Sequence, residues 1–131
     1  MKTYTDNFWQ ITIPDDWQAE LDDDCTSIFH DDSFGILQIS AEEFEDEVDY
    51  ETLAELAEEH IDAGAELEDI QLGPFEGFTL DYSIDKEFWR EWYLCYDRLF
   101  IYVTYNCLLE DESSEDDIVD TILSSLKINT H

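Results

Sequence analysis

The chain has 131 residues, of which 36 are acidic and five are Lys or Arg, and its formal net charge is −31 at pH 7. This charge disfavours direct binding to nucleic acid or to an anionic membrane, and leaves a basic protein partner, divalent cations or plain solubility as explanations. The hydrophobic fraction of 44% is enough for a packed core, so the composition argues against disorder and predicts a single domain, residues 1–131.

Short strands are predicted first along the chain. Residues 7–13 alternate between apolar and polar side chains and stop at Pro14, and residues 17–21 alternate again after the turn. Asp22, Asp23 and Asp24 form a polar break. Residues 25–30 and 34–40 then flank Asp31, Asp32 and Ser33, a pattern typical of a hairpin.

A helix is predicted after the acidic linker 41–49. Asp49 has the side chain of an N-cap. One face of the helix collects Tyr50, Leu53, Ala54, Ala57, Ile61 and Gly64, and Gly64 can help to end it.

The second half of the chain predicts the centre of a sheet. Strands are expected at 67–72 and 78–84, with Gly73 and Pro74 between them and a turn at Asp85 and Lys86. Residues 87–96 and 99–107 are rich in aromatic and β-branched residues, and Asp97-Arg98 between them predicts a hairpin. A loop longer by one or two residues is the alternative, because Asp-Arg is a weaker turn than Asp-Gly. Both faces of the second arm are apolar, so we expect it to be covered on both sides.

The two-residue turn also fixes the positions of two cysteines. With the turn at Asp97-Arg98, Cys95 lies opposite Phe100 and Cys107 lies opposite Phe88. The two thiols are then far apart, so we expect neither a disulfide nor a shared metal site between them. With Cys25 the count is odd, and no apolar leader or run of about 20 apolar residues is present, so the sequence predicts free thiols in the cytoplasm.

A final helix is predicted from the apolar positions Ile118, Val119, Ile122, Leu123 and Leu126. Ser113 or Ser114 is its expected N-cap, with Asp116 or Asp117 three residues further on. Lys127 is expected at its C-terminal end, where the helix dipole favours a cation.

This layout resembles the PsbP/Mog1-like group. The resemblance rests on the first strand ending in Ile-Pro-Asp-Asp-Trp (residues 13–17), on Gly77-Phe78, on the hairpin sequences 90–94 and 101–105, and on the closing Ile-Leu-Ser-Ser-Leu-Lys-Ile (residues 122–128). It implies an α+β fold with an antiparallel β-sheet sandwiched between helices (α/β/α). Members of the group are mostly non-enzymatic photosystem assembly subunits, a Ran-binding protein and chaperones of type VI secretion effectors.

No motif in the sequence predicts an enzyme. Carboxylates are abundant, but no pair stands out as an acid/base couple, and the calcium-loop, zinc, phosphate-loop and nucleophile-elbow patterns do not occur. His30, His60 and His131 are scattered, and His60 is expected to be a partly exposed helix residue. We therefore expect no catalytic residue, no cofactor and no specific metal site.

Two less ordinary features point to partner binding. Three of the five basic residues, Lys86, Arg90 and Arg98, lie in or beside the central hairpin. Either Arg90 pairs with nearby acids and stacks on a ring, which is the favoured interpretation, or it forms a recognition spot with aromatic anchors. The second feature is four acidic blocks, at 22–24, 42–51, 58–68 and 110–120. The candidate partner-binding residues are Trp89, Arg90, Trp92, Arg98, Glu45, Asp46, Glu47, Glu58, Glu59, Asp62, Asp116 and Asp117.

These features lead to three functional hypotheses. The first is a protein that binds a basic partner, as a monomer or homodimer, most concretely an immunity-type inhibitor of a basic toxin such as a nuclease. The second is a chaperone or adaptor that shields an apolar segment of another protein. The third is a metal-dependent or carboxylate enzyme, which would need a pocket with converging acids and strongly perturbed pKa values. Beside these three functions stands the plain alternative that the acidity serves only solubility or adaptation to a salty cell interior.

Overall fold

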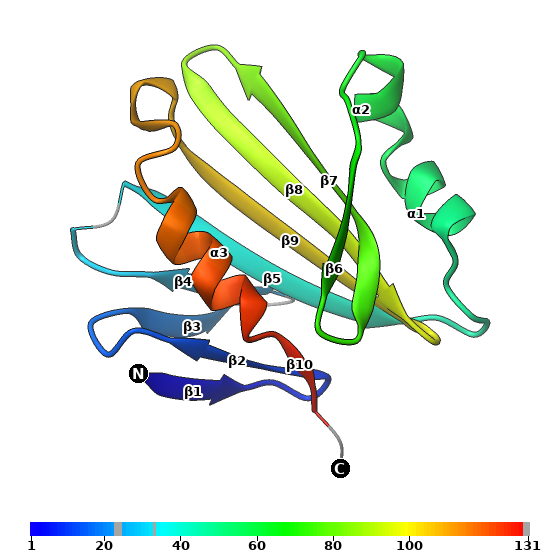
Figure 1. Cartoon of the computed structure of the whole chain (residues 1–131), viewed down its shortest axis with the longest axis horizontal. Helices are drawn as coiled ribbons and strands as arrows, with labels where there is room; N and C mark the ends of the chain where they lie inside the picture. Colours follow the sequence, from blue (N-terminus) through cyan, green and yellow to red (C-terminus); the bar gives the residue numbers. More distant parts are fainter. Residues whose placement is uncertain (23–24, 33, 130–131) are drawn as a thin grey trace.

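The largest element of the fold is one antiparallel sheet, seen in Figure 1 as a twisted diagonal layer. The structure is a computed structural model that describes residues 1–22, 25–32 and 34–129. The seven strands have the order β3-β4-β5-β9-β8-β7-β6. Their bounds are β3 (Gln18–Asp22), β4 (Cys25–Phe29), β5 (Gly35–Glu43), β6 (Glu68–Leu72), β7 (Phe75–Ile84), β8 (Glu87–Tyr96) and β9 (Leu99–Leu108).

A small sheet and three short helices complete the fold. The small sheet has the order β1-β2-β10. The bounds are β1 (Lys2–Thr5), β2 (Trp9–Ile13), β10 (Lys127–Ile128), α1 (Tyr50–Leu56), α2 (Glu58–Asp62) and α3 (Asp116–Ser124), with a 3₁₀ turn at Leu109–Asp111. None of the helices in the described part of the chain has the length and apolar character that a membrane crossing requires.

The predicted central hairpin is confirmed. Tyr96 pairs with Leu99, so the connection is the two-residue turn and not the longer loop. Asp97 supplies the left-handed backbone conformation of this turn, with φ of 54°. The register places Cys95 opposite Phe100 and Cys107 opposite Phe88, as predicted. The second arm, β9, is the middle strand of the seven.

Two apolar clusters cover the two faces of this hairpin. On one face, Trp92 and Leu94 of β8 pack with Val119, Ile122 and Leu123 of α3 and with the inner side of β2. Tyr93 and Cys95 point to the opposite face. They pack with Leu53 of α1 and with Ala57, the residue that follows α1. The fold is thus a largely antiparallel sheet with a few short helices, and its central strands are covered on both faces as expected.

The predicted helix after Asp49 is present but divided. The Asp49 side chain accepts a hydrogen bond from the backbone N–H of Thr52 at 2.9 Å, which confirms the N-cap. The helix then breaks at Ala57, which separates α1 from α2. Gly64, with φ of 96°, follows α2 and reverses the chain toward β6.

Several predicted boundaries were wrong. β5 continues to Glu43 because it pairs with β9 as far as Leu99, so the acidic linker is shorter than predicted. β1 and β10 were not predicted, because they are short and polar and are recruited by backbone pairing with β2. Lys127 therefore lies in β10 and not in the last turn of α3. The predictions that involve Asp23, Asp24, Ser33 and His131 concern positions outside the described residues.

The predicted cap of α3 was also wrong. The N-cap residue is Glu115, not Ser113 or Ser114, and it makes no side-chain cap bond. Its carboxylate instead reaches β5 and β9. Oε1 accepts from the backbone N–H groups of Phe34 at 3.1 Å and Gly35 at 2.9 Å, and from the Tyr105 hydroxyl at 2.6 Å. This 7%-exposed carboxylate joins the start of α3 to the sheet.

A second buried carboxylate joins α2 to the opposite face. Glu91 of β8 is only 2% exposed. Its two oxygens accept from the Tyr82 hydroxyl at 2.5 Å and the Tyr93 hydroxyl at 2.6 Å. His60 of α2 places its Nε2 3.3 Å from Glu91 Oε1 and stacks on the Tyr82 ring. His60 is half-buried, in agreement with its predicted partly exposed position.

We predict that Glu115→Ala lowers the free energy of unfolding by about 2–4 kcal/mol, because it removes the acceptor of the buried Tyr105 hydroxyl and breaks the link to the part-buried N–H of Gly35. Urea denaturation measures this. Asp117→Ala, at an exposed position in the first turn of α3, is the matched control and should stay within about 0.5 kcal/mol of the parent chain. Equal losses in the two variants would contradict the structural importance of Glu115.

A second prediction concerns alkaline pH. Burial, followed by the hydrogen bond and charge of a nearby glutamate, raises the pKa of Tyr82, Tyr93 and Tyr105. Burial and Glu91 also raise the pKa of Tyr102. The folded state favours the neutral phenols, so their contribution to stability is complete below about pH 10 and is lost at higher pH.

Phenolate absorbance and circular dichroism, followed together in an alkaline titration, test this prediction. Ionisation of these four tyrosines should accompany unfolding. Tyr82→Phe should lower by one the number of tyrosines that ionise together with unfolding. Ionisation of all four near pH 10 in a chain that keeps its native dichroism would contradict it.

Candidate functional site

A cleft of about 890 Å³ lies where the sheet meets the segment before β6. One wall is residues 64–70, the floor comes from β7 and β8, and α3 contributes Asp120. The lining residues are Gly64, Ala65, Glu66, Leu67, Glu68, Asp69, Ile70, Thr79, Leu80, Asp81, Arg90, Trp92 and Asp120.

The cleft exists because β6 is half as long as β7. β6 pairs with β7 only from Leu72 opposite Phe75 to Glu68 opposite Thr79. Before Glu68 the chain lies outside the sheet and comes from α2, as Figure 1 shows. The contact between His60 and Glu91 holds α2 on the sheet. The Tyr50 hydroxyl, whose pKa burial and Asp69 raise to about 12, bonds to Asp69 in the cleft wall.

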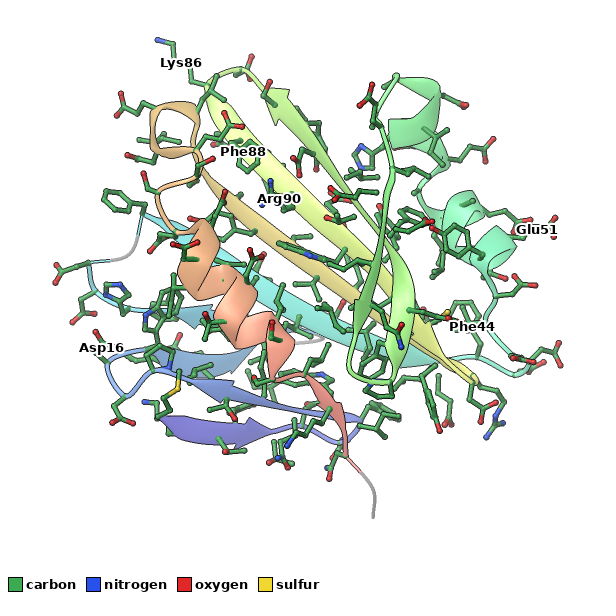
Figure 2. All side chains as sticks on the ribbon, viewed as in Figure 1. Asp16, Phe44, Glu51, Lys86, Phe88 and Arg90 are labelled. Atoms are coloured by element: carbon green, nitrogen blue, oxygen red, sulfur yellow. The ribbon has the colours of Figure 1, made fainter. Side chains whose placement is uncertain are left out.

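Arg90 is the one cation among the residues that line the cleft. Its guanidinium makes two hydrogen bonds to Asp81, from Nε at 2.6 Å and from Nη2 at 3.0 Å. Nη1 also lies 3.4 Å from Asp116 Oδ1, and the group sits 5.6 Å from the centre of the Phe88 ring. Figure 2 shows Phe88 and Arg90 close together on β8. The favoured interpretation of Arg90, pairing with acids and stacking on a ring, is confirmed.

The cleft has a surplus of negative charge. Five acidic residues line it, Glu66, Glu68, Asp69, Asp81 and Asp120, but the Asp69 carboxylate points to the opposite face, where it accepts a hydrogen bond from Tyr50. Arg90 already neutralises Asp81, and it shares the rest of its charge with Asp116. Burial raises the pKa of Asp120, Arg90 opposes that shift, and the neighbouring Asp116 and Asp117 add to it. An incoming cation would relieve this repulsion.

The three basic residues of the hairpin do not form one spot. Arg90 lies six residues before Tyr96, the last residue of β8, so about 20 Å of strand separates it from the turn that holds Arg98. Arg98 is exposed at the β8–β9 turn, 4.0 Å from Glu43. Lys86 projects from the β7–β8 turn, as Figure 2 shows. The clustering seen in the sequence is therefore lost in the fold.

The aromatic anchors are also separated. Trp89 lies on the face opposite Arg90, because neighbouring strand residues point to opposite faces, and it stacks on Tyr82. Trp92 shares a face with Arg90 but is 2% exposed and belongs to the core. It forms part of the cleft floor and offers a partner almost no surface.

The predicted acidic residues occupy three separate places. Glu45, Asp46 and Glu47 are exposed between β5 and α1, and Glu58, Glu59 and Asp62 are exposed on α2. Asp116 and Asp117 begin α3, where Asp116 approaches Arg90. Of these three places, only the start of α3 reaches Arg90, through Asp116.

The sequence analysis missed Asp81 as the partner of Arg90. Register could have found it, since a two-residue turn at Asp85 and Lys86 places Asp81 directly opposite Arg90. Glu66, Glu68 and Asp120 lay within recognised acidic blocks, but nothing in the local sequence brings them to one cleft.

The buried Glu91, Cys95 and Cys107 are not among the residues that line the cleft. The buried Glu91 is occupied by tyrosine hydroxyls and His60. Burial raises the pKa of the Cys95 and Cys107 thiols, which disfavours their reactive thiolate form. Within residues 1–22, 25–32 and 34–129, no group of three or more His, Cys, Asp or Glu side chains is arranged to hold a metal ion.

Comparisons with solved structures identify the fold. A protein from Bacteroides thetaiotaomicron superposes with a TM-score of 0.72 at 12% identity, over 99% of this chain and 49% of the other, so this chain spans about half of that protein. LpqN of Mycobacterium tuberculosis, described as involved in cell envelope biogenesis, gives a TM-score of 0.64 at 16% identity over 93% and 83% of the two chains. The cyanobacterial PsbP of Synechocystis gives 0.64 at 14% identity over 98% and 92%.

No protein-family model and no curated protein matches the sequence. The structural matches confirm the resemblance seen in the sequence at the level of fold. The identities of 12–16% are too low to transfer a function. The chain therefore has the PsbP/Mog1-like fold.

Proposed function

We propose that this protein is a non-enzymatic binding module that recognises a basic protein through the acidic cleft beside β7. The observation that carries the proposal is the cleft itself, whose lining holds the carboxylates of Glu66, Glu68, Asp81 and Asp120 and a single arginine that Asp81 and Asp116 already pair. A cationic side chain entering there would meet uncompensated negative charge at close range.

The rest of the surface supports capture of such a partner. A net charge of −31 attracts a basic protein over several ångströms before contact, and it speeds association more than it strengthens the complex. The same charge repels nucleic acid and anionic membranes. Selection of the partner would then depend on the shape and charge of the cleft.

The most concrete form of this function is an immunity-type inhibitor that covers the basic active site of a toxin such as a nuclease. No disulfide joins Cys25, Cys95 and Cys107 in the described residues, which suits action in the reducing cytoplasm. In this proposal α3 on one face and α1–α2 on the other act as the two covers of an α/β/α sandwich. They keep the cleft rigid while a partner binds.

A chaperone or adaptor would use exposed apolar surface instead. Exposed large apolar side chains do occur, at Leu21 on β3, Leu56 on α1, Ile84 on β7 and Leu108 on β9. Ile84 and Leu108 lie in one row of the sheet with the exposed Glu87 between them, whereas Leu21 lies on β3 at the other end of the strand order. An apolar row that a carboxylate interrupts favours a charge-based function over the shielding of one continuous apolar segment.

The proposal predicts a partner whose binding weakens as salt rises. The immobilised chain should retain a basic protein from its native lysate at low ionic strength and release it along a salt gradient. The dissociation constant of the purified partner should then increase with salt, because screening shortens the reach of surface charge. Tight binding that ignores ionic strength would contradict the electrostatic mechanism.

Paired charge variants separate the cleft from the overall charge. Glu66→Gln with Glu68→Gln removes two charges from the cleft wall and should weaken binding roughly fivefold. Asp16→Asn with Glu20→Gln also removes two exposed charges, one just before β3 and one on it. Because β3 is the edge strand farthest from β6 in the sheet, this pair should change binding little. Equal effects of the two pairs would leave only a diffuse charge effect, and no effect of either would favour acidity for solubility alone.

A further inference from the structure

The free edge of β7 beside the cleft is a place where another strand can add to the sheet. β6 covers β7 only as far as Thr79, and no other strand in the described residues pairs with that side of residues 80–84. An unpaired strand edge presents backbone N–H and C=O groups to a partner. The cleft lies next to this edge, since Thr79, Leu80 and Asp81 line it.

The register identifies the backbone groups that are available. Residues beside a tight turn form a hydrogen-bonded pair, and such pairs alternate along an antiparallel ladder. Ile84 pairs with Glu87 across the β7–β8 turn, so Ile84, Tyr82 and Leu80 direct their backbone groups toward β8. Asp81 and Ser83 therefore direct their backbone N–H and C=O groups outward, away from β8. Thr79, two residues before Asp81, points its backbone groups to the same side and pairs with Glu68 of β6.

We propose that an extended, lysine- or arginine-bearing segment of the protein partner binds as an additional strand on the free edge of β7 and places its basic side chains in the acidic cleft. This inference rests on the proposed function and names the part of the partner that the cleft recognises. Backbone pairing with Asp81 and Ser83 supplies orientation, and the cleft carboxylates select the side chains.

The two faces of the edge require an alternating segment. Asp81 shares a face with Arg90, because the two are directly paired, so every second side chain of the added strand points toward the cleft carboxylates. The side chains between them point toward the face of Tyr82 and Ile84. Ile84 is 56% exposed and can contact an apolar residue there. The expected pattern is basic and apolar in alternation.

Charge decides between a foreign strand and a second copy of this chain. Two copies paired edge to edge would each bring a net charge of −31, and Asp81 of each would approach the acidic cleft of the other. Such repulsion acts against self-association at exposed edges. A basic segment gains attraction at the same place, so a basic partner is the favoured occupant.

The direct probe is a synthetic peptide of about seven residues, alternating lysine and valine, which extends over roughly 23 Å. We expect it to bind the whole chain with an affinity measurable by calorimetry at low salt, and to shift and protect the backbone amides of Asp81 and Ser83 in NMR spectra. Amides of β3, the strand at the other end of the sheet order, serve as the internal control.

Matched peptides separate backbone pairing from charge. The same peptide with alternate backbone nitrogens methylated along one edge keeps its charge but cannot donate to β7. It should bind roughly tenfold more weakly. An alternating glutamate–valine peptide should not bind. Equal binding of the methylated and unmethylated lysine peptides would overturn strand addition.

Variants of the chain provide the reciprocal test. Ser83→Pro removes an outward N–H on the edge of the sheet, where proline is tolerated, and should weaken peptide binding roughly tenfold. Ser83→Thr keeps the N–H and should bind as the parent chain does. Circular dichroism and urea unfolding check that both variants fold. If Ser83→Pro is unfolded, the methylated peptide with the parent chain decides the question.

The outcomes also distinguish this inference from the proposed function. Salt-dependent binding of a basic protein partner that Ser83→Pro leaves unchanged would overturn strand addition and leave the acidic binding function standing. Absence of binding to every basic probe and partner would overturn both. A dimer of this chain that Ser83→Pro abolishes, seen by sedimentation, would identify a second copy as the occupant and would overturn the basic segment.

Discussion

The pairing register of β8, which the tight turns at its two ends set, determines which side chains meet on each face of the sheet. The turns at Asp85-Lys86 and Asp97-Arg98 allow no slip, so each residue of β8 has a defined partner on β7 and on β9. Alternation then sends Arg90 to one face and Glu91 to the other. A shift of one residue would exchange their faces, leave Arg90 away from Asp81 and move Trp92 out of the cluster that packs against α3.

The scarcity of cations shapes how the protein accommodates buried negative charge. With five Lys and Arg residues for 36 acids, few carboxylates can have a salt bridge. Glu91 is stabilised by tyrosine hydroxyls and by His60, and Glu115 by backbone amides and a tyrosine hydroxyl. Both carboxylates join a helix to the sheet. Hydrogen bonds from tyrosine hydroxyls and backbone N–H groups thus replace most of the salt bridges that these glutamates would otherwise need, and they help to hold α2 and α3 on the two faces of the sheet.

The proposed binding surface is a consequence of one short strand. Because β6 begins only at Glu68, β7 keeps a free edge beyond Thr79. Residues 64–67, which precede β6, lie away from this edge and form a wall of the cleft. Free edges are usually guarded against aggregation by charge. Here the guarding charges are negative and lie beside a cleft, so the same side chains that prevent self-pairing would admit a basic strand. Solubility and selective binding can therefore share one physical origin.

The sequence by itself determined the central hairpin, its turn, the N-cap of the first helix and the resemblance to the PsbP/Mog1-like fold, because these depend on alternation and on short-range hydrogen bonds. It could not determine the break at Ala57, the carboxylate of Glu115 bridging to β5 and β9, or the short strands β1 and β10, which depend on partners distant in sequence. The cleft was decided only by tertiary structure. Its residues come from separate segments, and the residues that are close in sequence, Trp89, Arg90 and Trp92, are separated by the pleat of the strand and by burial.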